Sequence, residues 1–259
     1  MYPKLLHIYG PFFIQSYGFC IALGLLIFGW LLFSDKKRAA LVNDDQFHTL
    51  LMIGILCGVL GGRLLYFATN TSMAWYEFFE FWYGGFAVLG SILAVLFVMP
   101  IFFKRYQVPI LPVLDRVALY TPLLQSISRI GCFLSGCCYG KQAIVSWAIT
   151  YTNHECMAPL GVSLHPTQLY SALFLAAIFF FLLWIQRFLK NNGQLLACYL
   201  FFGGFERFIV DFFRDDRTYS LTPMSFYSDH QIISGALALF GGCLFLYCTV
   251  SKKTTAQVL

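Results

Sequence analysis

The chain has 259 residues, of which 59% are hydrophobic and only 11% are charged, whereas soluble globular chains carry about 25% charged residues. This composition excludes an ordinary soluble domain and predicts an all-α integral membrane protein, with one membrane domain over residues 1–259. The net charge of +5 comes from scattered basic residues without a basic arm or helix, so we expect no nucleic-acid partner.

Seven segments are long and apolar enough to cross a membrane, which takes about 20 mostly apolar residues. They lie at roughly 15–33, 49–69, 86–103, 112–134, 168–187, 194–213 and 230–250. The fourth and sixth are less apolar than the others, and we still predict that both cross. The first has no small-residue cleavage site at its end, so we expect a permanent span rather than a cleaved signal peptide.

Basic residues in short loops predict the orientation of the spans, because they favour the cytoplasmic side. Nine of them fall on the side of the C-terminus and four on the opposite side. We therefore expect the N-terminus outside and the C-terminus in the cytoplasm. The two longest loops, about 70–85 and 137–167, then lie outside. Polar residues at the outer ends of the spans predict an outward-facing polar cavity.

Three arginines lie inside predicted spans and well away from the flanking loops, each in the later part of a span that runs outward: Arg63, Arg129 and Arg207. A charged side chain at a helix centre costs at least about 2.5–3.5 kcal/mol. We infer that these arginines bind an anionic ligand in the membrane, most simply a phospholipid headgroup. The alternatives are snorkelling to the interface and an internal ion pair, such as one between Arg207 and Asp211.

Two segments place arginines where they could hold a phosphate. Arg129 and Gly131 open a glycine-rich helix end, where a guanidinium can bind phosphate through two parallel hydrogen bonds beside backbone N–H groups. Arg207, Asp211 and Arg214 are spaced i, i+4 and i+7, which on a helix puts them on one face. A face of this kind must point into a polar cavity rather than into lipid.

The segment 164–170 opens the fifth predicted span. His165 has two interpretations of similar weight, a direct catalytic role or a place at the start of the helix, where His165 or Thr167 could cap it. Pro166 suits the first turn of a helix.

The cysteines and histidine at Cys132, Cys137, Cys138, His154 and Cys156 lack the spacing of structural zinc sites. We therefore predict no metal and no cofactor. A disulfide from Cys137 or Cys138 to Cys156 is more plausible, because an outer face is oxidising.

Several motifs together resemble the prolipoprotein diacylglyceryl transferase family of the bacterial inner membrane. They are Tyr17-Gly18, GGRLLY at 61–66, WYGG at 82–85, RIG at 129–131, HPTQLY at 165–170 and ERFIVDFFR at 206–214. The resemblance covers most of the chain in the same order. It implies seven spans with the N-terminus outside. It also implies a reaction in which the diacylglyceryl group of phosphatidylglycerol is transferred to the lipobox cysteine thiol of a prolipoprotein signal peptide, with release of glycerol phosphate.

The resemblance also implies roles for particular residues. The family's two important arginines match Arg129 and Arg207. Phospholipid contacts are expected from Arg63, Arg129, Arg207, Arg214, Tyr17, Gly131, Gln168 and Tyr170.

The sequence departs from the family pattern mainly where protons would be transferred. Leu89 stands where the family carries a histidine or tyrosine, and Ser171 where it carries a glutamate. Cys132 replaces an asparagine and Asp211 a glutamate. We therefore expect His165 or Asp211 as the catalytic base, or activation of the thiol by the cationic pocket alone. A related lipid-group transferase with another acceptor and a non-catalytic phospholipid-binding paralogue are the alternative functions.

Overall fold

The computed structural model describes residues 1–9, 12–70, 75–79, 85, 87–219 and 226–256. The chain forms two compact units. One contains Met1–Ser34 and Leu114–Leu259, and the other contains Asp35–Val113. A single membrane domain over 1–259 stays a prediction.

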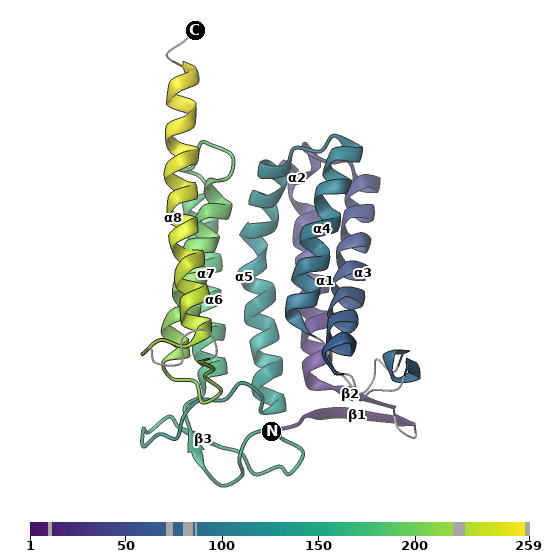
Figure 1. The fold of residues 1–259 in the computed structure, drawn as a ribbon, viewed down its shortest axis with the longest axis vertical. Coiled ribbons are helices and arrows are strands. Elements are labelled where there is room, and N and C mark those ends of the chain that lie inside the picture. Colours follow the sequence, from purple (N-terminus) through teal and green to yellow (C-terminus); the bar gives the residue numbers. More distant parts are fainter. Residues whose placement is uncertain (10–11, 71–74, 80–84, 86, 220–225, 257–259) are drawn as a thin grey trace. The chain divides into compact units, whose positions relative to one another are not determined.

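Long helices dominate the described part of both units (Figure 1). They are α1 (Ser16–Ser34), α3 (Asp44–Thr69), α4 (Val88–Tyr106), α5 (Ile110–Ser135), α6 (Thr167–Ile185), α7 (Gln194–Asp211) and α8 (Asp229–Ala256). The shorter elements are α2 (Lys36–Ala39), the 3-10 helix η1 (Trp75–Phe79) and strands β1 (Lys4–Tyr9), β2 (Phe12–Gln15), β3 (Ile149–Thr150) and β4 (Ser163–Leu164). β1 pairs with β2 and β3 with β4, both antiparallel.

Six of these helices, α1, α3, α4, α5, α6 and α8, are long and apolar enough to cross a membrane. This confirms the all-α membrane class. The sixth predicted span, 194–213, forms the helix α7, but α7 is not among the six. Its crossing, the sides of the two termini and the outward-facing cavity stay predictions.

In the unit Asp35–Val113, α3 packs against α4. The side chain of Asn43 caps α3 by accepting a 2.8 Å hydrogen bond from the backbone N–H of Gln46. Close approach of the two helices depends on Gly61, where a Cβ would lie 2.6 Å from the carbonyl oxygen of Gly90. A side chain at this position would therefore force the two helices apart.

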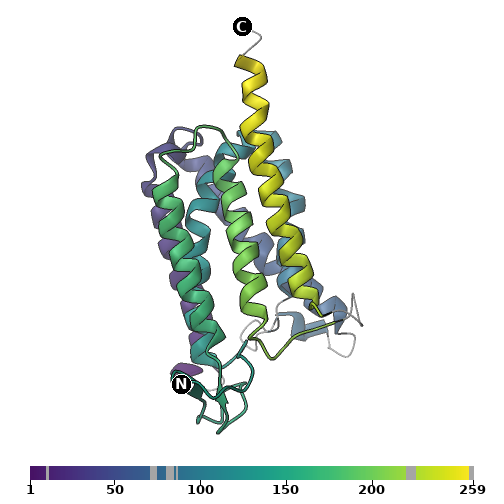
Figure 2. The same cartoon turned by 90° about the vertical axis from the view of Figure 1, so that its left-hand side faces the viewer.

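In the other unit, Asp115 explains one of the charges in the less apolar fourth span. Its carboxylate accepts hydrogen bonds from the backbone N–H groups of Gly193 (2.6 Å) and Leu196 (2.8 Å). These groups begin α7, where the unpaired N–H groups and the helix dipole favour a negative charge. Asp115 thus fixes the start of α7, which then packs along α8 (Figure 2).

The polar end of this unit collects the start of α1, the end of α5, the start of α6, the end of α7 and the start of α8 (Figure 1). The loop between α5 and α6 has a small core of its own, formed by Tyr151, Ala158 and Leu164. An ion pair of 2.6 Å between Lys4 and Glu155 ties this loop to strand β1. The loop is therefore a folded cap beside the ends of the helices.

Candidate anion-binding site

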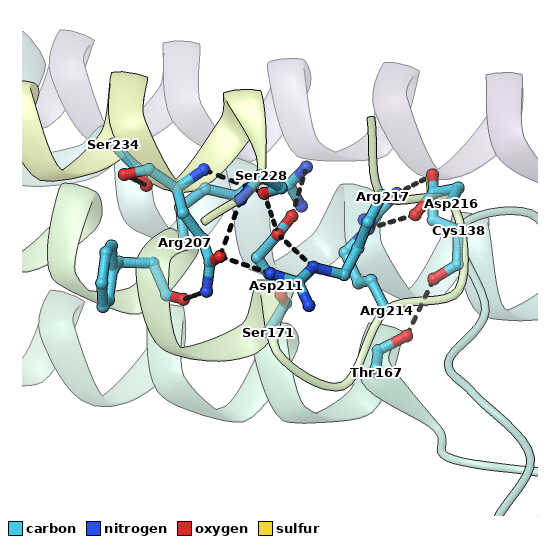
Figure 3. Close-up of polar contacts among 12 residues, drawn as sticks. Cys138, Thr167, Ser171, Arg207, Asp211, Arg214, Asp216, Arg217, Ser228 and Ser234 are labelled. Atoms are coloured by element: carbon cyan, nitrogen blue, oxygen red, sulfur yellow. Dashed lines mark hydrogen bonds and ion pairs between the residues drawn. The ribbon is translucent and has the colours of Figure 1, made fainter. Parts of the chain in front are cut away.

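Arg207 and Asp211, on adjacent turns of α7, form an ion pair in which Nη2 lies 3.7 Å from Oδ1. Asp211 is fully buried and its other oxygen, Oδ2, accepts a hydrogen bond from Ser228 Oγ. Nε of Arg217 lies 3.4 Å from the same oxygen. Asp211 is therefore held between two guanidinium groups and a hydroxyl (Figure 3), so the internal ion pair considered from the sequence does form.

The pairing of Arg207 is incomplete, however. Its Nη1 is buried and has no hydrogen-bond partner among the described residues. A contact of 3.7 Å is also longer than the 2.7–2.9 Å typical of a charge-assisted hydrogen bond. Arg207 therefore keeps donor capacity for another acceptor.

Two further arginines lie near Arg207. The charges of Arg129, in α5, and Arg214 both act on the Arg207 guanidinium. The same three charges act on Glu206, which is buried and accepts a 2.6 Å hydrogen bond from Ser171 Oγ in α6. Glu206 therefore has its hydrogen-bond partner on another helix, α6. Arg129, Arg207 and Arg214 form what we call the arginine cluster.

Arg214 belongs to this cluster, but its position in the fold differs from the prediction. Helix α7 ends at Asp211, so Arg214 lies beyond the helix and does not share a helical face with Arg207. Arg214 is buried, and its Nε and Nη2 donate to the two carboxylate oxygens of Asp216, the first at 2.7 Å. The predicted i, i+4, i+7 face was wrong at its last position, because the chain turns after Asp211.

This pairing changes the ionisation of both groups. Burial alone would lower the pKa of Arg214, but the hydrogen bonds and charge of Asp216, together with the Cys138 thiol, more than offset this and raise it. Burial alone would raise the pKa of Asp216, and the hydrogen bonds and charge of Arg214 together hold it below its usual value. The pair is therefore fully charged near neutral pH.

His165 and Tyr170 lie together at the start of α6. The imidazole Nδ1 is 3.1 Å from the Tyr170 hydroxyl oxygen, which also accepts a 2.7 Å hydrogen bond from Trp147 Nε1. The N-cap of α6 is Pro166, and no side chain caps this helix. The capping interpretation of His165 and Thr167 was therefore wrong, because the chain enters α6 through a proline and both side chains bond elsewhere.

Thr167 and Gln168 instead hold the segment that follows α5. Thr167 Oγ1 donates to the carbonyl of Cys138 at 2.8 Å, and Gln168 Nε2 donates to the carbonyl of Cys137 at 2.7 Å. Gln168 also donates to the Tyr151 hydroxyl at 3.2 Å, and its buried Oε1 has no hydrogen-bond partner in the part of the chain that the structure describes. A phospholipid contact of Gln168 stays a prediction.

Gly131 and Tyr17 meet where α5 crosses α1. A Cβ on Gly131 would lie 2.8 Å from Cys20 Cβ and 3.1 Å from Tyr17 Cα, so the glycine permits the close approach of the two helices. The charge of Arg129 acts on the Tyr17 hydroxyl. Their contacts with a phospholipid stay predictions.

Arg63 belongs to the other unit, where it is buried. Its Nε donates to the carbonyl of Phe78 at 3.0 Å and its Nη1 to that of Gly85 at 2.9 Å. Arg63 therefore holds the segment after α3, and its role in lipid binding stays a prediction. Leu89 is exposed at the start of α4, and residues 82–84 of the WYGG motif lie outside the described residues.

The cysteines after α5 are arranged differently from the prediction. All nine cysteines of the chain are free, so neither Cys137 nor Cys138 is joined to Cys156. The sulfurs of Cys132, Cys137 and Cys138 instead lie within 4.8 Å of one another. Hydrogen bonds from Cys132 and Cys137 hold the pKa of the Cys138 thiol below its ordinary value, and Arg214 contributes to this. The predicted disulfide was wrong because these side chains turn toward the end of α5.

Sequence reasoning missed two members of the site, Arg217 and Ser228, which complete the surroundings of Asp211. Arg217 also donates a 2.6 Å hydrogen bond to Gln231. Both residues lie in the segment between α7 and α8, where no periodic pattern marks which side chains turn inward. The buried aspartate was the only available signal, because a buried carboxylate requires partners.

Comparison with known proteins agrees with this arrangement of motifs. The family model for prolipoprotein diacylglyceryl transferase matches residues 3–247. The chain belongs to this family. It is 35% identical over 227 residues to a phosphatidylglycerol–prolipoprotein diacylglyceryl transferase of Clostridium tetani, covering 87% of this chain and 90% of the relative. A relative of Clostridium perfringens with the same name, numbered 2, is 32% identical over 234 residues, covering 89% of each.

A Dehalococcoides mccartyi relative of the same name, from strain CBDB1, is 30% identical over 256 residues, covering 96% of this chain and 95% of the relative. The chain is therefore a member of a transferase family along nearly its whole length. The matched region includes every residue of the arginine cluster.

Proposed function

We propose that this chain is a phosphatidylglycerol–prolipoprotein diacylglyceryl transferase of the bacterial inner membrane. The observation that supports this most directly is the buried Nη1 of Arg207, which has no hydrogen-bond partner among the described residues. A buried guanidinium donor needs an acceptor. Within a membrane protein, a phospholipid phosphate is an anionic acceptor that the surroundings supply.

The charges around Arg207 favour an anionic ligand. Four guanidinium groups and three carboxylates interact in this region: Arg129, Arg207, Arg214 and Arg217, with Glu206, Asp211 and Asp216. The guanidinium groups outnumber the carboxylates, so an anion such as the phosphodiester of phosphatidylglycerol would meet a positively charged environment.

In the proposed reaction the acceptor sulfur attacks the glyceryl carbon that carries the phosphate ester. A C–S bond forms, the C–O bond breaks, and its electron pair stays on the oxygen of the departing glycerol phosphate. The developing charge is stabilised by fixed cations that need no rearrangement during the step. Arg129 and Arg207 are assigned to this role, with Arg214 in support.

The acceptor thiol must also lose a proton, because the thiolate is the nucleophile and a free thiol has a pKa of about 8.5. We assign this proton to His165. Its Nδ1 faces the Tyr170 hydroxyl, which orients the ring and directs Nε2 away from that contact. Asp211 is less suitable, because both its oxygens lie among cations and the Ser228 hydroxyl, and we assign it to positioning Arg207.

The proposal includes a topology in which seven helices cross, α7 among them, and the arginine cluster lies in an outward-facing cavity. The ends of α5 and α7 and the start of α6 lie at the same end of their unit (Figure 1). The acceptor is the lipobox cysteine of a prolipoprotein signal peptide, and Tyr17, Gly131, Gln168 and Tyr170 contact the phospholipid.

The test uses purified full-length protein in detergent with phosphatidylglycerol and a lipobox peptide. We expect release of glycerol phosphate and a peptide heavier by one diacylglyceryl group. A peptide with serine in place of the cysteine should be inert, because serine is scarcely ionised near neutral pH. Binding of phosphatidylglycerol without a thioether product, across several lipobox peptides, would identify a non-catalytic paralogue instead.

A further inference from the structure

The end of α5 carries three thiols that the reaction described above does not use. Gly136 follows the helix with φ of +72°. The N–H of Gly136 bonds to the carbonyl of Phe133, and the N–H of Cys137 bonds back to the carbonyl of Cys132. This is the Schellman arrangement, in which side chains at the positions of Cys132 and Cys137 meet. The fold of the helix end therefore brings these two sulfurs together.

Cys138 joins them because its own backbone is left-handed, with φ of +59°. This conformation is uncommon for a residue other than glycine, and side chains from α6 support it. Thr167 holds the carbonyl of Cys138 and Gln168 holds that of Cys137, at 2.8 Å and 2.7 Å. The three sulfurs lie within 4.8 Å of one another on a backbone that is fixed from two sides.

We propose that Cys132, Cys137 and Cys138 bind a soft divalent cation such as Zn²⁺ through three thiolates, with a fourth coordination position open to an exogenous thiol. Zn–S bonds are about 2.3 Å long, so three ligating sulfurs would be about 4 Å apart. The observed sulfurs need only a small inward movement to reach this geometry. Cys132 is buried, while Cys137 and Cys138 are partly exposed, which leaves the site one open side.

The surroundings suit such a site. Three thiolates and Zn²⁺ carry one net negative charge, and two cations face the sulfurs. Arg214 lies near Cys138 in Figure 3 and its charge acts on the Cys138 thiol, while the charge of Arg129 acts on Cys132. Partners outside the first coordination sphere commonly orient and stabilise metal ligands in this way.

The open position has a use in the reaction, and this part rests on the proposed function. The acceptor thiol would bind the cation through sulfur and release its proton to water or to His165. A metal-bound thiol is deprotonated, so the nucleophile would form at neutral pH. Attack on the glyceryl carbon then forms the C–S bond and breaks the C–O bond, after which the thioether leaves the cation. No oxidant or reductant takes part.

Metal binding is tested without any activity measurement. Reduced, metal-free protein is titrated with Cd²⁺, and the ultraviolet sulfur-to-cadmium charge-transfer band is recorded. We expect one bound ion per chain and a charge-transfer band whose intensity corresponds to three thiolate ligands. Cys132→Ser, Cys137→Ser and Cys138→Ser should each weaken Cd²⁺ binding by more than about 100-fold, since even changes beyond the first sphere weaken it by about 10–100-fold.

Cys156→Ser is the matched control, because Cys156 lies in the same loop outside the three-sulfur cluster. It should bind Cd²⁺ as the wild type does. Thermal unfolding of each variant in detergent separates loss of ligand from loss of fold. Absence of a thiolate band in the folded wild-type protein, or a band that the control loses equally, would overturn the proposal.

The open position is tested by adding a lipobox peptide to the Cd²⁺-loaded protein. The intensity of the charge-transfer band should increase by the contribution of one thiolate, and a peptide with serine in place of the cysteine should leave it unchanged. Turnover should fall on removal of the metal and return with Zn²⁺. Full turnover by protein shown to be metal-free would overturn the role of the cation and leave the proposed function intact. Inactivity of Zn²⁺-loaded protein on every acceptor would instead count against the proposed function.

Discussion

Replacement of Arg207 by alanine removes a guanidinium whose Nη1 has no hydrogen-bond partner among the described residues and whose ion pair with Asp211 is long, at 3.7 Å. Removal of one preorganised donor to a developing anion typically lowers kcat by about 10²–10³, or about 2.7–4 kcal/mol. We expect a loss of this size in Arg207→Ala. Arg207→Lys should recover little of it, because an ammonium cannot donate two parallel hydrogen bonds.

The same change should leave the fold in place, for a reason that the structure supplies. Asp211 keeps the Ser228 hydroxyl and Arg217 after Arg207 is removed. The lost contact of 3.7 Å is weaker than a hydrogen bond to a charged group, which contributes about 1.5–3 kcal/mol. The free energy of unfolding should therefore fall by less than about 1.5 kcal/mol.

The assay measures glycerol phosphate release in detergent, beside thermal unfolding of the same preparations. Arg217→Ala is the matched control, because Arg217 binds the same aspartate and also bonds to Gln231. It should lower stability more than Arg207→Ala does and lower turnover less. Turnover of Arg207→Ala within about threefold of the wild type would refute the assignment of Arg207 to the phosphate.

Four further outcomes are expected. A reporter fused after Leu259 should be active only in the cytoplasm, as the basic-residue bias predicts, and activity outside would reverse the topology. His165→Ala should lower kcat, measured as turnover, far more than it weakens phosphatidylglycerol binding, measured by lipid titration. Equal effects on both would contradict the role of His165 as the catalytic base. Arg214 lowers the pKa of Asp216, so the stability that Asp216 contributes is present above the usual pKa of 3.8 and is lost as pH falls through the lowered pKa. In acid unfolding scans Asp216→Asn should lack this loss of stability. A profile like that of the wild type would exclude the ion pair. Gly61→Leu should destabilise the α3–α4 pair by about 1–3 kcal/mol in chemical unfolding, because the Cβ of the new side chain would lie 2.6 Å from the carbonyl oxygen of Gly90. Unchanged stability would contradict the close approach of the two helices.

The sequence by itself determined the membrane class and the positions of the long helices, and it singled out arginines inside the predicted spans. Apolar segments of about 20 residues predict helices, because unpaired backbone groups cannot lie in lipid. The same reasoning singled out Arg129 and Arg207, since a charge inside such a segment needs a partner. The family resemblance likewise depended on the order of short motifs, which a single chain displays without any structure.

Tertiary structure alone decided which polar groups meet. Ser171 and Glu206 are 35 positions apart, and their 2.6 Å hydrogen bond follows from how α6 packs against α7. The end of α7 at Asp211 took Arg214 off the helical face that periodicity assigned to it. The three-sulfur cluster depends on one Schellman turn and one left-handed cysteine, held by side chains from another helix. Spacing in the sequence does not encode such contacts, because they arise from the packing of distant elements and from single backbone angles.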